Sequence, residues 1–287
     1  MKIMKLFRNI SLIAFVLFAF SCEKHEIIYN ADPISDVAEF QLHYVVPVSA
    51  VASNNIYKVE INDQLYANNT APLNTYNAIP SGSVGRFYTT RIGENNIKLY
   101  MGLNENQRLI YDQNCVLRQG KQNIFVYDFN KPPIVFDNGH PYQTNITEYS
   151  DSTAWIKFYN FLYEKQGEPT SLKLQYQYQY TMNYETRKKS DWLNIGQPVG
   201  FGETTGWQPV IVIKSVELSS GYARLDYRIK VIDANGEDVG NLQILSGNKY
   251  VDYSDYWNAY IGRRYHHILA GLRTASPTSS VRQFTAL

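Results

Sequence analysis

The sequence predicts an all-β protein with two tandem antiparallel β-sandwich domains. Tyrosine accounts for 24 of the 287 residues and only 18% of the residues are charged, a composition that suits pleated sheets because aromatic side chains pack well on them. In the first half, short stretches of alternating apolar residues are separated by turn residues, and none has sustained helical spacing. The order of these stretches recurs in the second half, which indicates a tandem repeat.

The N-terminal segment has the pattern of a signal sequence. Lys2, Lys5 and Arg8 give a basic start, residues 10–20 are almost entirely apolar, and Cys22 follows. The apolar run is too short for a comfortable bilayer span. The arrangement resembles a bacterial lipoprotein signal, which implies cleavage before the cysteine and acylation of its thiol. The alternatives are an ordinary secreted protein and an uncleaved anchor.

Strands are predicted throughout the first half. A clear case is residues 57–61, where Tyr57, Val59 and Ile61 alternate before a turn at Asn62. The predicted strands cover residues 38–47, 57–63, 64–66, 85–90, 96–100, 108–117 and 123–129. Glycines or other turn residues separate them, as expected for a sandwich or a barrel.

The second half repeats this order. The stretch 154–159 aligns with 38–43, and the glycine-led stretch 262–269 aligns with 120–127. The second copy is longer, and we place its additional residues in a hairpin and a turn. These predicted insertions cover residues 180–194 and 215–222.

Proline, glycine and asparagine are concentrated between the two halves, so the domain boundary is predicted there. The chain is divided into a lipoprotein signal peptide (1–21), a polar tether (22–37), a first β-sandwich (38–136), a linker (137–153) and a second β-sandwich (154–287).

The order of motifs in residues 38–129 resembles the Ig-like or transthyretin-like β-sandwich repeats of Bacteroidota outer-membrane lipoproteins. The resemblance implies a non-enzymatic protein, lipid-anchored in the outer membrane and facing the periplasm or the cell surface, with a binding, adhesion or assembly role. A weaker resemblance is to fimbrillins, which polymerise by strand exchange. Residues 32–40 contain no Arg or Lys at which a fimbrillin would be matured. A third alternative is a carbohydrate-binding accessory protein of a glycan-uptake system.

The sequence offers little for catalysis. A net charge of +1 argues against a nucleic-acid partner. His266 and His267 are neighbours on a predicted strand and point to opposite faces, and no histidine has zinc-ligand spacing. Cys115 lies in a predicted strand and reads as a buried thiol. Residues 196–206 are glycine-rich but lack the Gly-Lys-Ser/Thr ending of a phosphate loop, and read as a flexible loop or bulged strand. We expect no enzymatic activity, cofactor or metal ion.

Two aromatic clusters are candidates for binding a surface glycan or a protein. Tyr176, Tyr178 and Tyr180 alternate with glutamines and share one face of a strand. They either pack the sandwich core or form an exposed ladder.

The second cluster, in a predicted loop over residues 250–260, includes Tyr253, Tyr256 and Trp257. It suits recognition better, because Tyr and Trp dominate binding hot spots. Separately, Ser152 lies in a motif that resembles the O-glycosylation sites of Bacteroidota, in the predicted linker.

Overall fold

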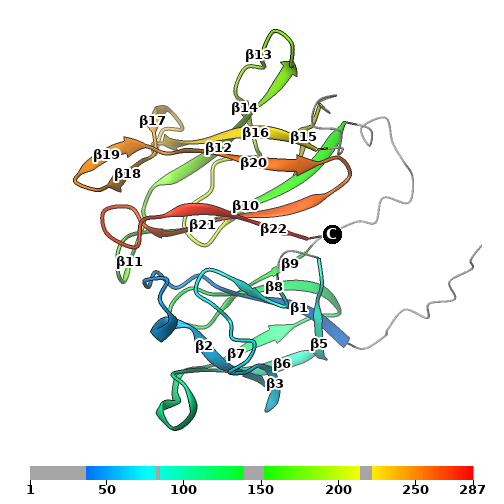
Figure 1. The fold of residues 1–287 in the computed structure, drawn as a ribbon, viewed down its shortest axis with the longest axis vertical. Helices are drawn as coiled ribbons and strands as arrows, with labels where there is room; N and C mark the ends of the chain where they lie inside the picture. Colours follow the sequence, from blue (N-terminus) through cyan, green and yellow to red (C-terminus); the bar gives the residue numbers. More distant parts are fainter. Residues whose placement is uncertain (1–36, 82–84, 139–151, 214–221, 287) are drawn as a thin grey trace, which may run out of the picture. The chain divides into compact units, whose positions relative to one another are not determined.

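Alternating side chains form strands over most of the described chain. The computed structural model describes residues 37–81, 85–138, 152–213 and 222–286, and residues 36–287 belong to one compact unit. Cys22, the signal peptide and all but the last residue of the tether lie outside the described residues. Apart from the 3-10 helices Ala52–Asn54 and Asn104–Asn106, the regular structure described is β-strand (Figure 1). The all-β sandwich fold is therefore confirmed.

The first sandwich consists of two sheets. One sheet packs against the second sandwich and is called the inner sheet. It contains β1 (Val37–Tyr44), β4 (Ala78–Ile79), β5 (Tyr88–Arg91), β8 (Gly120–Val126) and β9 (Ile134–Asp137). Its outer sheet contains β2 (Ile56–Ile61), β3 (Gln64–Ala67), β6 (Gly93–Met101) and β7 (Arg108–Leu117).

The second sandwich is built in the same way. Its inner sheet contains β10 (Thr153–Lys165), β11 (Glu168–Pro169), β15 (Thr204–Ile211), β21 (Arg264–Leu272) and β22 (Ser280–Thr285). Its outer sheet contains β12 (Lys173–Asn183), β13 (Lys188–Lys189), β14 (Leu193–Asn194), β16 (Tyr222–Ile232), β17 (Asp238–Asn241) and β20 (Ser254–Tyr260). Strands β18 (Gln243–Ser246) and β19 (Lys249–Asp252) form a separate hairpin.

The two inner sheets share one unusual feature, a parallel pair between their first long strand and a strand from the end of the repeat. In the first sandwich β1 pairs with β8, and in the second β10 pairs with β21, while the other pairs are antiparallel. Ala38 lies opposite Gly120, and Trp155 lies opposite Arg264. If Ala38 is aligned with Ala154 and Gly120 with Gly262, the pairing of the first sandwich would place Arg263 opposite Trp155. The structure places Arg264 there, so the two parallel pairs differ in register by one residue.

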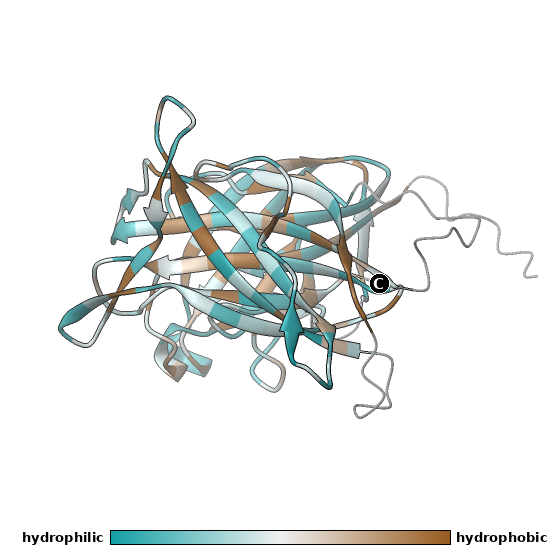
Figure 2. Ribbon diagram, turned by 90° about the horizontal axis from the view of Figure 1, so that it is seen from above, coloured by the Kyte–Doolittle hydropathy of each residue, from teal (hydrophilic) through white to brown (hydrophobic). Residues whose placement is uncertain are grey.

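Each sandwich encloses its own core. Apolar and polar residues alternate along many strands, as Figure 2 shows by hydropathy, and the apolar faces of paired sheets meet. On β12, Tyr176 and Tyr178 are buried in the second core, and Tyr180 packs against its edge. Of the two interpretations of this tyrosine ladder, the core interpretation is therefore confirmed.

The inner sheets are buried on both faces. Along β10, Ile156 and Phe158 face the core of the second sandwich, while Tyr159 and Phe161 face the other way. That second face meets the equivalent face of the first inner sheet in a third apolar cluster, here called the seam. A strand buried on both faces needs an almost continuous apolar sequence, which residues 154–163 provide.

Aromatic rings fill the seam. The Phe125 ring of β8 stacks on Phe161 of β10, with ring centres 4.8 Å apart, and lies 4.9 Å from Tyr159. His43 of β1 also stacks on Phe125, with ring centres 4.5 Å apart. Phe125 is completely buried and thus contacts both inner sheets at once.

Truncation of this ring tests the importance of the seam. We expect Phe125→Ala to lower the free energy of unfolding by about 4 kcal/mol, because it removes a buried ring and leaves a cavity. Urea denaturation measures the change. Val116→Ala is the control, since Val116 is 66% exposed and its truncation should change stability by less than about 0.5 kcal/mol. Equal effects of the two substitutions would contradict the structure.

Candidate functional site

The solvent-facing side of the outer sheet in the second sandwich carries three arginine–aromatic stacks. We call this surface the outer face. It is defined by the outward residues of five strands, by the segment that precedes β14 and by the turn that follows β20. Those residues are Gln177, Gln179, Lys189, Trp192, Asn194, Tyr222, Arg224, Asp226, Arg228, Ser254, Tyr256, Asn258, Tyr260 and Arg263.

The first stack lies at the centre of β16 and β20. The Cζ atom of Arg224 is 3.7 Å from the centre of the Tyr256 ring, within the range of a cation–π interaction. Nε of Arg224 also donates to Asp226 at 2.9 Å, and Lys189 donates to the same carboxylate. Partial burial raises the pKa of Asp226, but these two hydrogen bonds outweigh it and hold the pKa below its usual range. Asp226 thus fixes two cations beside an exposed ring.

The second stack lies on the neighbouring strands. The Cζ atom of Arg228 is 4.4 Å from the Trp192 ring centre, and its Nε donates to Gln177 at 2.7 Å. Gln177 in turn donates to Asn194 at 2.7 Å. Planar amide, guanidinium and indole groups therefore form a continuous row across three strands.

The third stack lies where β16 begins and β20 ends. Tyr222 and Tyr260 are paired across the two strands, with ring centres 5.0 Å apart, and Cζ of Arg263 lies 4.3 Å from the Tyr260 ring. Tyr256 and Tyr260 are four residues apart on one strand, which corresponds to roughly 13 Å. The aromatic groups of the outer face therefore extend along β20.

The predicted loop over residues 250–260 is instead mostly strand, in β19 and β20, and its aromatic residues point in different directions. Tyr256 is 49% exposed and belongs to the outer face. Tyr253 is buried in the core, where its hydroxyl accepts a hydrogen bond from the Val281 amide at 2.8 Å. Trp257 is half-buried against the same core. The interpretation of Tyr253 and Trp257 as surface residues is therefore wrong, because alternation along β20 turns Trp257 inward.

Sequence reasoning missed the arginines of the outer face. Arg224, Asp226 and Arg228 alternate along β16, a pattern that marks one solvated face but does not identify the aromatic partners. Those partners come from other strands, and only the cross-strand register brings them together. Ser152, the predicted glycosylation site, is half-buried, and its carbonyl accepts a hydrogen bond from Val212.

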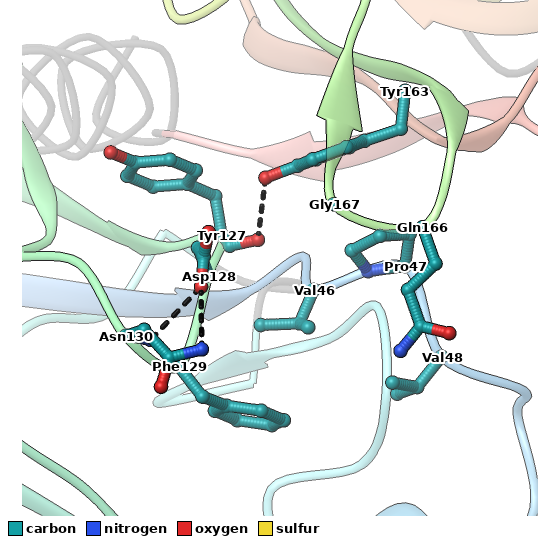
Figure 3. A pocket seen from close by; sticks show the side chains of 10 residues that line it. All are labelled: Val46, Pro47, Val48, Tyr127, Asp128, Phe129, Asn130, Tyr163, Gln166 and Gly167. Carbon is teal, nitrogen blue, oxygen red and sulfur yellow. Dashed lines mark hydrogen bonds between the residues drawn. The ribbon is translucent and has the colours of Figure 1, made fainter.

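A small pocket of about 200 Å³ lies beyond the ends of β1 and β8. Because these strands are parallel, the residues that follow both of them reach the same end of the sheet, and the turn after β10 completes the pocket (Figure 3). Tyr127 and Phe129 contribute to its walls. The Tyr163 hydroxyl donates to the Tyr127 carbonyl at 3.0 Å, and Asp128 accepts from the Asn130 amide at 2.9 Å. At about 200 Å³ the pocket is smaller than the roughly 300–1,000 Å³ typical of small-molecule sites, so we rank it below the outer face.

The buried histidines belong to the interior. His266 and His267 point to opposite faces of β21, as predicted: His266 bonds Tyr159 in the seam, and His267 bonds Tyr176 in the core. His43 is fully buried in the seam and donates from Nε2 to Asn123 at 3.2 Å. The Cys115 thiol is buried, as expected, and burial raises its pKa to about 12.

The described residues contain neither a group of metal ligands nor a helix that could span a membrane. In that part of the chain, no three His, Cys, Asp or Glu side chains are grouped to hold a metal ion. No helix described in the structure is long and apolar enough to cross a membrane. In comparisons with known proteins, no family model matches the chain and no curated protein matches it.

Burial of His43 should make the free energy of unfolding depend on pH in the acid range. Burial lowers its pKa from the ordinary 6.5 to about 4, so between these values the unfolded chain binds a proton that the folded chain does not. Stability is therefore retained above pH 6.5 and falls as the pH decreases toward 4. Between pH 7 and pH 4 this difference in proton binding amounts to about 3 kcal/mol of stability.

Urea denaturation at pH 7, 5.5 and 4 measures this dependence. His43→Gln, which removes the titrating ring, should flatten the decline by about 3 kcal/mol relative to the unmodified chain. If both proteins lose the same stability over this interval, His43 is not the buried neutral ring that the structure shows.

Proposed function

We propose that this protein is a non-enzymatic, membrane-anchored binding protein whose outer face contacts an extended surface glycan. The observation that carries the proposal is the set of three arginine–aromatic stacks on one face of a single sheet. Strands β16 and β20 carry four of the six side chains and hold them more rigidly than a loop would, and a pre-ordered surface loses less entropy on binding.

The chemistry of the outer face favours a polar ligand. Sugars offer hydroxyl groups to planar amides and guanidinium groups, and they offer C–H faces to aromatic rings. Gln177, Asn194 and Asn258 provide the amides, and Tyr256 provides the exposed ring. A stable protein interface usually has an apolar centre, whereas the centre of this face is the Arg224–Asp226–Lys189 cluster.

The dimensions of the face favour a polymer over a single sugar. The aromatic groups extend along β20 for roughly 13 Å between Tyr256 and Tyr260, and the amide row crosses the strands beside them. A chain of several sugar units can contact several of these groups at once, which raises affinity through multiple weak contacts.

The anchor in this proposal is a lipid on Cys22. Acylation of that cysteine would tether the sandwiches through the polar segment 22–37 at the outer membrane. A single acyl chain binds a membrane only marginally, so stable anchoring needs more than one. The proposed role is to hold a binding surface close to the membrane.

The glycan proposal is tested by removing the central stack. We expect the detergent-solubilised full-length protein to be retarded by at least one soluble polysaccharide in affinity gel electrophoresis. In Tyr256→Ala/Arg224→Ala this affinity should fall by about 2 kcal/mol, or roughly 30-fold, as for a binding hot spot.

Tyr250→Ala is the matched control. Tyr250 is as exposed as Tyr256, at 50% against 49%, but it lies on the β18–β19 hairpin outside the outer face. Its replacement should leave retardation unchanged. Absence of retardation by any polysaccharide, or an equal loss in the control, would refute the glycan proposal.

The anchor has its own test. Cys22→Ser should move the protein from the membrane fraction to the soluble fraction and abolish labelling with a radioactive fatty acid, because serine lacks the acylated thiol. Membrane fractionation followed by immunoblotting measures the distribution. If Cys22→Ser stays in the membrane fraction, the lipid anchor is wrong, and this outcome is independent of the glycan test.

A further inference from the structure

The glycine-rich segment 195–203, between β14 and β15, is firmly held in place. Ile195 and Val199 are buried in the core of the second sandwich, and Phe201 packs in the seam, 4.9 Å from the Tyr163 ring. The backbone of Val199 exchanges two hydrogen bonds with Leu174, at 2.9 and 3.0 Å. Of the two interpretations from the sequence, a flexible loop or a bulged strand, the second describes residues 204–206, where the pairing of β15 with β10 shifts register. Apolar residues anchor the preceding part of the segment between its glycines.

Gly202 shows how closely this segment fits the first sandwich. Its φ of +72° is strained for any other residue, and an added Cβ would lie 2.9 Å from Cδ1 of Ile134 on β9. The Gly202 amide also donates to the Asn160 carbonyl at 2.8 Å. The segment is thus fixed against both sandwiches.

The segment, the start of β15 and Phe136 of β9 line an open cavity of about 500 Å³. This volume lies within the range of roughly 300–1,000 Å³ typical of small-molecule sites, whereas the pocket beyond β1 and β8 is smaller. Phe136 of β9 lines one side. The polar side chains that line it are Gln197, Glu203, Thr204, Thr205 and Gln208.

The lining specifies the class of ligand. Among the described residues it contains amides, hydroxyls and one carboxylate but no cationic side chain, so a phosphate or other anion would meet Glu203 without a counter-charge from them. A purely apolar ligand would leave the amides and the carboxylate unpaired, which is costly. A neutral polyol can donate hydroxyl hydrogens to Glu203 and Gln208 while it places a C–H face against Phe136.

We propose that this cavity, here called the glycine-segment pocket, binds a neutral mono- or disaccharide unit. Its residues are distinct from those of the outer face, so the proposal adds a saccharide site to the protein and does not depend on the proposed polymer surface. Glu203 accepts a hydrogen bond from the Gly200 amide at 2.7 Å through Oε2, which orients the carboxylate while Oε1 is available to a sugar hydroxyl.

The experiment titrates the full-length protein with glucose, galactose, mannose, N-acetylglucosamine and their common disaccharides, followed by saturation-transfer NMR. A ligand of this size is expected to bind with a Kd on the order of 1 mM. Inorganic phosphate serves as the anionic probe and should not compete. Gln197→Ala/Glu203→Gln should weaken saccharide binding at least tenfold, with an unchanged melting temperature as evidence of an intact fold.

Gln166→Ala is the matched control, because Gln166 is also an exposed glutamine at a pocket, but at the one beyond β1 and β8. Binding should be retained in this variant and in Tyr256→Ala/Arg224→Ala. The proposal is overturned if no neutral saccharide binds, if phosphate competes, or if Gln166→Ala loses binding as fully as the pocket variant. Absence of polysaccharide retardation of the unmodified protein, with saccharide binding retained, would count against the outer face and leave the pocket intact.

Discussion

The double-sided burial of the two inner sheets is the constraint on which this structure depends. Phe40 and Leu42 of β1 face the first core, while His43 on the same strand is buried in the seam. A sandwich on its own would expose the second face of its inner sheet, including the fully buried Phe125 and Phe161. Exposed apolar area of this kind is unfavourable in water. Each sandwich therefore covers a face that the other cannot leave exposed.

The seam also accounts for the placement of the polar surfaces. With both inner sheets covered, the outer sheets are the ones with a solvated face, and on the second sandwich that face carries the arginine–aromatic stacks. The seam in addition brings β9 against the glycine-rich segment, so the glycine-segment pocket is formed by residues of both sandwiches. The packing of the two inner sheets in the seam thus positions both proposed binding surfaces on rigid elements.

Much of the fold could be predicted because alternation of apolar residues specifies strands directly, as at Tyr57, Val59 and Ile61. Alternation also showed that Tyr176 and Tyr178 share a face, but the tyrosine side chain suits both a core and a surface, so their burial required the structure. The sequence predicts a loop where β20 lies, because Asp255 and Asn258 are residue types common in turns. The arginine–aromatic stacks and the seam depend on cross-strand register and on the packing of distant strands, which local sequence does not encode.

The central claim is that the seam joins the two sandwiches into one cooperative body. Differential scanning calorimetry of the full-length protein tests it most directly. The account predicts a single endotherm in which the calorimetric and van't Hoff enthalpies agree, because neither inner sheet is covered without the other. Two separated transitions, each with the enthalpy expected of one sandwich, would contradict it.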